Sequence, residues 1–150
     1  MKSTLKLNRL EQANECYVVI DTNVLVSALL KWNSAPGQVV QQTYAHEIIP
    51  VFNDSILQEY EEVLSRKKFH FPKETVDFLI SRLKAIGENL ATVEALVGDF
   101  PDPKDVVFFE VTMEKNKTDN AFLVTGNLKH FPQHPKVVSP AEMLRILDNL

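Results

Sequence analysis

The sequence predicts an α/β fold in three layers, with a mostly parallel central sheet of four to five strands flanked by helices. Short apolar runs such as YVVI (17–20) alternate with longer segments of helical periodicity, a pattern typical of βαβ units. Parallel strands joined by helices are covered on both faces of the sheet. No repeat, low-complexity stretch or Gly/Ser linker divides the chain. We therefore expect a polar N-terminal extension over residues 1–15 and a single domain over residues 16–150.

Five apolar segments are the predicted strands, in chain order 17–21, 47–51, 92–97, 121–125 and 136–138. The segments around them are predicted helices, in chain order 23–31, 36–45, 54–66, 73–89, 104–117 and 140–148. Residues typical of helix starts support several of these boundaries: Asn53 or Asp54 as an N-cap, Pro72 and Pro103 near a first turn, and Ser139 with Pro140. Because ligands bind at the carboxyl ends of strands in open parallel sheets, polar residues directly after strands are the first candidates for a site.

Composition and charge narrow the class of protein. With 150 residues, of which 45% are hydrophobic, the chain is large enough to bury one core. Its formal net charge of −4 argues against a nucleic-acid binder with a broad basic face, but not against an enzyme that gathers acidic residues in one pocket. No apolar run is long enough to cross a bilayer, and residues 1–15 lack the apolar segment of a secretory signal. The single cysteine, Cys16, excludes an internal disulfide, so we expect a cytoplasmic protein with a buried thiol.

Asp21 directly ends the first predicted strand and is followed by Thr22 and Asn23. Aspartate is a common N-cap, so capping of the next helix explains this residue as well as function does. A carboxylate at the end of a buried strand costs desolvation energy unless another group pairs with it. Thr22 and Asn23 can hydrogen-bond to such a carboxylate and orient it, as supporting residues do around metal ligands.

The stretch TGN (125–127) lies at the end of the fourth predicted strand, so Thr125 and Asn127 are candidate supporting residues. Asn127 can offer a neutral oxygen to a site or cap a turn, and Gly126 allows a tight turn or a close approach. His130 is the only histidine near this predicted sheet edge. Its role there is either structural or that of a supporting residue of the site. The four histidines show no metal-ligand spacing, and the chain has no P-loop, dinucleotide-binding or nucleophile-elbow motif.

Three glutamates lie close together in the predicted helix at 54–66. Glu62 falls opposite its apolar stripe and is interpreted as solvated surface. Glu59 and Glu61 flank the stripe, and the helical geometry does not separate them. Further along, Asp102, Pro103 and Asp105 form a helix start that resembles a capping box. The helix after them is apolar on almost every side, so its start is expected to face the sheet edge, where the helix dipole favours an ionised carboxylate.

The segments VVIDTNVLVSALL (18–30), ILQEYEEVLSRKKF (56–69), DPKDVVFFEV (102–111), LVTGNLKHFP (123–132) and VVSPAEMLRIL (137–147) resemble, in this order, the PIN-domain family. The resemblance is strongest to the branch of toxins in VapBC-like toxin–antitoxin pairs. The matching segments cover nearly all of the chain after residue 16.

This resemblance implies catalytic and metal-binding roles for particular residues. The first family aspartate corresponds to Asp21, the glutamate to Glu59 rather than Glu61, and the third acidic position to Asp105, with Asp102 as a further metal ligand. The fourth position, aspartate in many relatives, is Asn127, so the site carries one fewer negative charge. Clustered carboxylates of this kind suit Mg²⁺ or Mn²⁺, which lower the pKa of bound water and stabilise charge on a phosphate.

The resemblance implies an endoribonuclease that hydrolyses RNA phosphodiester bonds and leaves a 5′-phosphate and a 3′-hydroxyl. Its expected partners are an RNA substrate, a small antitoxin protein and a second copy of the chain, with no membrane. Lys104, Lys129 and the RKK stretch at 66–68 are expected to guide the RNA backbone. One alternative is a PIN-like scaffold that binds RNA or protein without cutting it, which Asn127 favours. Another, a haloacid-dehalogenase-type phosphatase, needs a second aspartate where this chain has Asn23.

Overall fold

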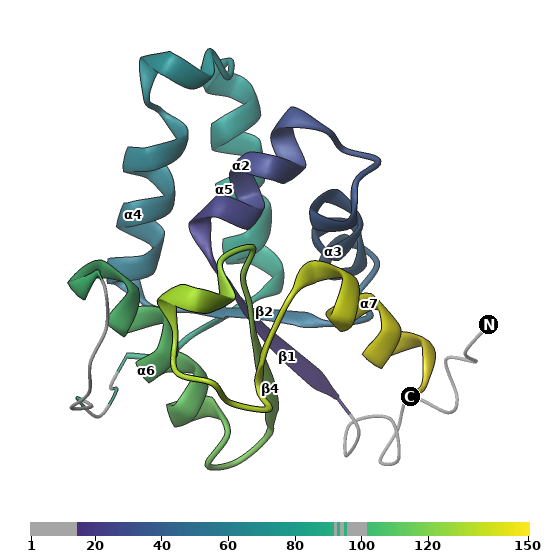
Figure 1. Cartoon of the computed structure of the whole chain (residues 1–150). Helices are drawn as coiled ribbons and strands as arrows, with labels where there is room; N and C mark the ends of the chain where they lie inside the picture. The colour runs from purple at the N-terminus through teal and green to yellow at the C-terminus, as the bar shows by residue number, and fades with distance from the viewer. Residues whose placement is uncertain (1–14, 92, 94, 96–101) are drawn as a thin grey trace.

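Five strands form one sheet in the order β3-β2-β1-β4-β5, and every pair among the described residues is parallel (Figure 1). The structure is a computed structural model that describes residues 15–91, 93, 95 and 102–150. The strands are β1 (Cys16–Ile20), β2 (Ile49–Phe52), β3 (Glu88–Asn89), β4 (Asn120–Val124) and β5 (Val137–Val138). The helices are α2 (Thr22–Leu30), α3 (Ala35–Tyr44), α4 (Asp54–Leu64), α5 (Lys73–Ile86), α6 (Val106–Lys115) and α7 (Pro140–Asp148). Short 3₁₀ helices are η2 (Lys67–Phe69), η3 (Pro103–Asp105) and η4 (Leu128–His130). The expected three-layer α/β fold is confirmed.

Strand β1 lies at the centre of the sheet because its residues are apolar on both faces. Val18, Val19 and Ile20 are at most 1% exposed. Cys16 is also buried, and burial raises the pKa of its thiol to about 11, so it packs as a small hydrophobic residue, as expected.

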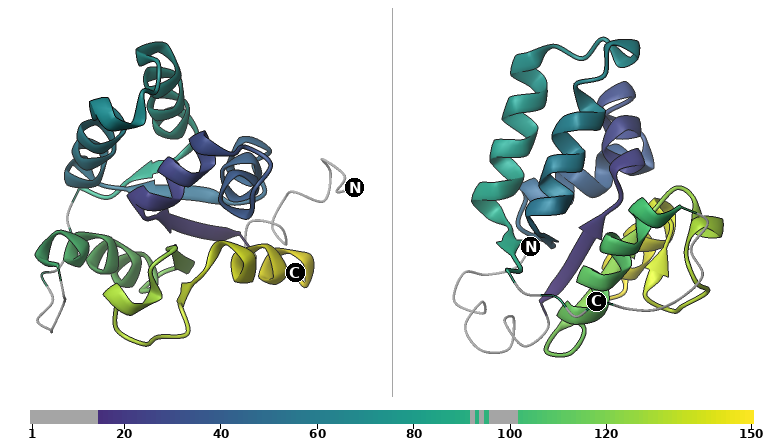
Figure 2. Two further views of the ribbon diagram at one scale, coloured as in Figure 1. Left: turned by 45° about the horizontal axis from the view of Figure 1, so that its top comes forward. Right: turned by 90° about the vertical axis from the view of Figure 1, so that its left-hand side faces the viewer.

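Helices α2 to α5 cover one face of the sheet and α6 covers the other (Figure 2). This follows from right-handed crossovers, since the chain moves from β1 outward to β3 and then crosses back to β4. Helix α7 packs against α3 and β4. Helix α6 contacts β1, β2 and β4, and Phe108 and Val111 are fully buried in it. Within the described ranges, no helix combines the length and apolar character needed to span a membrane.

Most predicted elements occur within a few residues of their expected bounds, but one helix was predicted too long. Helix α5 ends at Ile86, and residues 88–89 of the predicted helix at 73–89 instead form the edge strand β3. The residue that follows the helix is Gly87, where a Cβ atom would lie 2.5 Å from the Pro50 carbonyl oxygen and 2.5 Å from the Phe52 ring. The predicted strand at 92–97 falls largely outside the described residues, and residues 93 and 95 have no regular structure.

Two helix starts follow the predicted signals. The Asn53 side chain accepts a hydrogen bond from the Ile56 N–H (2.9 Å) at the start of α4. Ser139 and Glu142 form a reciprocal capping box at the start of α7. The predicted helix at 104–117 begins as the 3₁₀ turn η3 and continues as α6 to Lys115. The caps fix where α4 and α7 begin.

Lys115, at the end of α6, is a buried cation that joins three elements. Its Nζ lies 2.6 Å from Glu88 of β3 and 3.0 Å from Asp119 ahead of β4, and 4.2 Å from the ring centroid of Tyr17 in β1. Burial alone would lower the pKa of Lys115, but the hydrogen bonds to Glu88 and Asp119 outweigh it and leave the pKa raised. The cation therefore ties the edge strand β3 to the centre of the sheet.

Candidate active site

Two carboxylates are held by threonine hydroxyls at the carboxyl ends of β1 and β4. Asp21 is 5% exposed, and its Oδ2 accepts a hydrogen bond of 2.7 Å from the hydroxyl of Thr125, which is fully buried. The next residue, Thr22, donates its hydroxyl to Glu59 Oε2 at 2.6 Å. The structure thus places Asp21, Thr22, Glu59 and Thr125 together, although Asp21 and Thr125 are 104 residues apart.

The Asp21 side chain does not cap the helix that follows it. Asp21 occupies the N-cap position of α2 with extended backbone angles, but its carboxylate makes no capping hydrogen bond. The capping role that the sequence equally allowed for Asp21 is therefore not seen. Its backbone N–H instead donates to the Val124 carbonyl (2.9 Å), which continues the β1–β4 pairing by one residue.

Of the three glutamates on α4, only Glu59 faces this sheet edge. Glu59 is half-buried against Thr22, whereas Glu61 and Glu62 are exposed. Glu62 forms an exposed ion pair with Arg66 (3.2 Å), as expected for a surface residue. The charge of Glu61 instead contributes to the raised pKa of Lys73, which is mainly the effect of the hydrogen bond that Lys73 donates to Asp77.

Tyr60 is a supporting residue that the sequence placed only in an apolar stripe. Its hydroxyl donates a hydrogen bond to the carbonyl of Ile20, the last residue of β1, and the side chain is 2% exposed. Burial, followed by the negative charges of Asp21 and Glu59, raises the pKa of Tyr60 well above its ordinary value. This hydrogen bond fixes α4 against the end of β1, and so fixes Glu59 relative to Asp21. Its only signal in the sequence is its position directly after Glu59.

Asp105 brings a third carboxylate from the η3–α6 junction to the same edge. One of its oxygens, Oδ2, is buried without a hydrogen bond and lies 3.4 Å from His130 Nδ1, close enough for attraction but outside hydrogen-bond geometry. Asp102 is exposed, and its side chain accepts a hydrogen bond from the Lys104 N–H (3.0 Å), so it caps η3. The capping role of Asp102 is confirmed, and Asp105 makes no capping bond to α6.

The electrostatics of these groups are coupled. Burial, then the charges of Asp21 and Asp102, raises the pKa of Asp105 from 3.8 to about 6, and Glu59 adds to this rise. Burial likewise raises the pKa of Asp21, with Glu59 adding to it and the Thr125 hydrogen bond opposing it. The expectation that the helix dipole keeps Asp105 readily ionised is wrong, because burial and like charges outweigh the dipole.

Asn23 and Asn127 have different surroundings at this edge. Asn23 Oδ1 accepts a hydrogen bond of 3.3 Å from the Gly126 N–H and joins the ends of β1 and β4. Asn23 has no carboxyl group to serve as the acid/base of a phosphatase. The Asn127 side chain is exposed and makes no capping bond to η4, while its backbone N–H donates to the Thr125 hydroxyl (3.0 Å). Gly126 does not have a positive φ, so the tight turn expected there needs no glycine.

The donor chemistry of the site suits a hard divalent cation. Asp21 and Glu59 each have one carboxylate oxygen bound by a threonine, and no other side chain of the described residues donates a hydrogen bond to the second oxygen. Asp105 Oδ2 is a buried acceptor with no hydrogen-bond donor among the residues that the structure describes. Oxygen ligands of this kind are typical for Mg²⁺ and Mn²⁺. As they stand, however, no three Asp, Glu, His or Cys side chains in the described part of the chain are close enough to enclose an ion.

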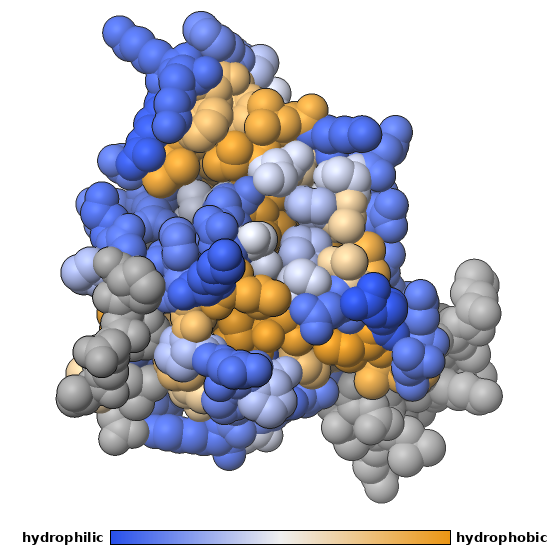
Figure 3. Space-filling model, viewed as in Figure 1, coloured by the Kyte–Doolittle hydropathy of each residue, from blue (hydrophilic) through white to orange (hydrophobic). Residues whose placement is uncertain are grey.

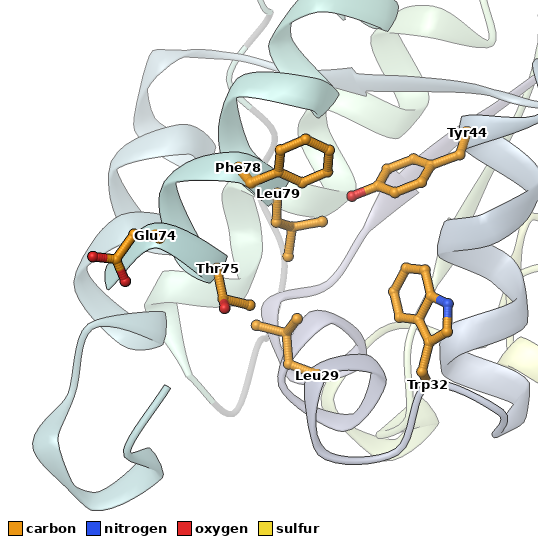
Figure 4. Close-up of a pocket in the computed structure, with 7 residues that line it drawn as sticks. All are labelled: Leu29, Trp32, Tyr44, Glu74, Thr75, Phe78 and Leu79. Carbon is orange, nitrogen blue, oxygen red and sulfur yellow. The ribbon is translucent and has the colours of Figure 1, made fainter. Parts of the chain in front are cut away.

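A separate apolar pocket of about 410 Å³ lies between α2, α3 and α5. Its lining is Leu29, Trp32, Tyr44, Glu74, Thr75, Phe78 and Leu79 (Figure 4). The aromatic rings and leucines gather around the cavity, and the Glu74 carboxylate points away from them (Figure 4). We call the end of the sheet that carries Asp21, Glu59 and Asp105 the acidic edge. None of these residues lines the pocket, and the single carboxylate of the pocket offers no basis for hydrolytic chemistry.

Comparison with known proteins places this arrangement in a family. Residues 17–129 match the model of the PIN domain, and the matched range contains Asp21, Glu59, Asp105 and Asn127. The comparison with curated proteins found no match.

Proposed function

The chain belongs to the PIN-domain family, whose members are typically nucleases, and on this premise we propose that it is a metal-dependent endoribonuclease. The observation that carries the proposal is the coupling of Asp21, Glu59 and Asp105 at one end of the sheet, where two of these carboxylates have raised pKa values. Perturbed carboxylates that gather at the carboxyl ends of strands are typical of functional sites.

The proposed roles follow from the contacts of each residue. Asp21, Glu59 and Asp105 are the proposed metal ligands, with Asp102 as a further acidic group. Thr125 and Thr22 would hold the first two carboxylates in orientation through their hydrogen bonds. Asn23 and Asn127 would support the β1 and β4 ends, and His130 would partly neutralise Asp105.

A bound Mg²⁺ or Mn²⁺ supplies a water of lowered pKa and stabilises charge on the phosphate. The protein supplies the ionised oxygens, whose mutual repulsion such a cation relieves. In-line hydrolysis of an RNA phosphodiester bond would leave a 5′-phosphate and a 3′-hydroxyl. The exposed Lys104 and Lys129 are proposed contacts for the RNA backbone.

The direct test compares the wild type with Asp21→Asn, which removes one charge and keeps the size of the side chain. We expect the wild type to cleave RNA in the presence of Mg²⁺ or Mn²⁺, and we expect this cleavage to stop when EDTA is added. We expect Asp21→Asn to lose cleavage while its far-UV circular dichroism spectrum stays unchanged. Equal loss of RNA with both proteins would show that the cleavage comes from a contaminant and would overturn the proposal. RNA binding by both proteins without any cleavage would instead support a non-catalytic scaffold, the alternative that Asn127 favours.

We further propose that the protein is the toxin of a type II toxin–antitoxin pair, in the VapC-like branch of the family, and that it acts in the cytoplasm. The basis is the sequence resemblance of the five segments from 18–30 to 137–147. The expected partners are a small antitoxin protein and a second copy of the chain. Induced expression should stop bacterial growth unless the antitoxin is co-expressed, and normal growth with soluble wild-type protein would contradict this role.

A further inference from the structure

The connection between α4 and α5 forms an exposed basic tip, which we call the hairpin tip and define as residues 65–72. The two helices project away from the sheet side by side, and the tip is their outer end (Figures 1 and 2). Arg66, Lys67 and Lys68 are all exposed. Arg66 pairs with Glu62, but neither lysine forms an ion pair with any described residue, and the Lys68 ammonium lies over the Phe69 ring. Two cationic side chains are therefore available at the tip of a protein with a net charge of −4.

Two phenylalanines stack beside these lysines. The rings of Phe69 and Phe71 lie 5.5 Å apart between centroids and are nearly parallel, at 11°. Phe71 packs against the core, whereas Phe69 is half-exposed and does not belong to the core cluster. The residue between them, His70, has a left-handed φ of 56°, which is uncommon for residues other than glycine. The Lys68 ammonium lies 5.1 Å from the Phe69 ring centroid.

Aromatic rings that are exposed next to cations are the combination that single-stranded nucleic acids recognise. Unpaired bases stack on aromatic side chains while lysine or arginine contacts the phosphates. In Figure 3, hydrophilic side chains project at the top of the view, where the hairpin ends, beside a hydrophobic strip. A duplex keeps its bases stacked inside and offers no free base to such a ring.

We propose that the hairpin tip is a binding platform for single-stranded RNA, with one base stacked on Phe69 and with Lys67 and Lys68 on the adjacent phosphates. This inference rests on the proposed function and specifies its substrate as unpaired RNA. Helix α4 connects the tip to the acidic edge, since its last residue, Leu64, follows Glu59 by about 8 Å along the helix at a rise of about 1.5 Å per residue. A short stretch of extended strand is therefore long enough to contact the tip and the acidic edge together.

The test measures binding of a labelled mixed-sequence single-stranded RNA, and of the same RNA annealed to its complement, to the full-length chain. All proteins carry Asp21→Asn so that cleavage does not interfere. Phe69→Ala has Phe78→Ala as its matched control, because Phe78 is 63% exposed on α5 away from the tip. Lys68→Glu has Lys84→Glu as its control, which makes the same charge change near the opposite end of α5. Phe69→Trp keeps an aromatic ring, and melting temperatures establish that each variant is folded.

We expect Phe69→Ala to weaken single-strand binding by at least about fivefold, and Phe69→Trp to retain it. For Lys68→Glu, the slope of log affinity against log salt should fall by about 0.7 for the lost lysine contact. Phe78→Ala and Lys84→Glu should bind as the parent does, and the duplex should bind more weakly than the single strand.

Unchanged affinity in Phe69→Ala and Lys68→Glu would overturn the platform, as would equal losses in the matched controls. Equal binding of duplex and single strand would overturn the stacking of a base on Phe69. If the tip binds a partner protein instead of RNA, Phe69→Ala and Lys68→Glu would leave the affinity for RNA unchanged. These outcomes do not test the proposed function. The proposed function is contradicted separately if the wild type shows no metal-dependent cleavage of any RNA.

Discussion

Asp105→Asn is expected to stabilise the metal-free protein at neutral pH, although it replaces a residue of the candidate active site. The substitution removes a charge that lies among Asp21, Asp102 and Glu59 and keeps the size of the side chain. A rise in pKa from 3.8 to about 6 corresponds to about 3 kcal/mol, at about 1.36 kcal/mol for each pKa unit. The Asp105 side chain is 15% exposed, so water screens part of this energy. We therefore expect a gain of about 1–2 kcal/mol.

The sign of this effect depends on pH in a defined way. Below about pH 4 the Asp105 carboxyl is protonated in both the folded and the unfolded chain, and the substitution removes no charge. Between about pH 4 and pH 6 the unfolded carboxyl ionises more easily than the folded one. Wild type therefore loses stability relative to Asp105→Asn across this window, and the difference is constant above it.

Urea unfolding in EDTA from pH 4 to pH 8 measures this difference directly. Glu62→Gln is the control, because Glu62 is exposed and paired only at the surface, where a salt bridge contributes about 0–1 kcal/mol. If Asp105→Asn is no more stable than wild type at pH 7, or if its gain is the same at pH 4, the electrostatic account of the site is wrong.

Four other outcomes follow from the same structure. Mn²⁺ should raise the melting temperature of wild type more than that of Asp105→Asn, and equal shifts would place the ion elsewhere. Glu59→Gln should abolish RNA cleavage while Glu62→Gln leaves it unchanged, and comparable losses would contradict the assignment on α4. Tyr60→Phe should cost about 1–2 kcal/mol in urea unfolding, because it leaves a buried carbonyl at the end of β1 without its donor. Gly37→Ala should cost about 2 kcal/mol or more, since the added Cβ would lie 2.0 Å from a backbone oxygen, and an unchanged urea midpoint would contradict this packing.

The fold was largely predictable because its signals are local. The apolar run before Asp21 marks a buried strand, and the Asn53 and Ser139 caps mark helix starts within one residue. The end of α5 was missed because the helical pattern continues past Gly87, whereas Glu88 and Asn89 pair with β2, a long-range contact that no local pattern reveals. Edge strand β3 has two residues, too few for a periodicity to reveal.

For the candidate site, the sequence indicated which residues to consider, and their roles stay predictions, but it did not indicate how these residues interact. The position of Asp21 after a strand predicted a site at that edge, and the family resemblance separated Glu59 from Glu61. The hydrogen bond from Thr125 to Asp21 joins residues that no local pattern connects. The raised pKa of Asp105 was also unpredictable, because it depends on how deeply a long-range contact buries the carboxyl. Metal-ligand roles remain predictions for these residues.

The parallel pairing of β1 with β4 has a consequence for synthesis of the chain on the ribosome. Asp21 leaves the ribosome before its hydroxyl donor Thr125, which follows 104 residues later. At about 5–20 residues per second, several seconds pass before the two can meet. During that interval the nascent polypeptide lacks the strand that completes this edge, so the acidic cluster is not assembled before β4 has been synthesised.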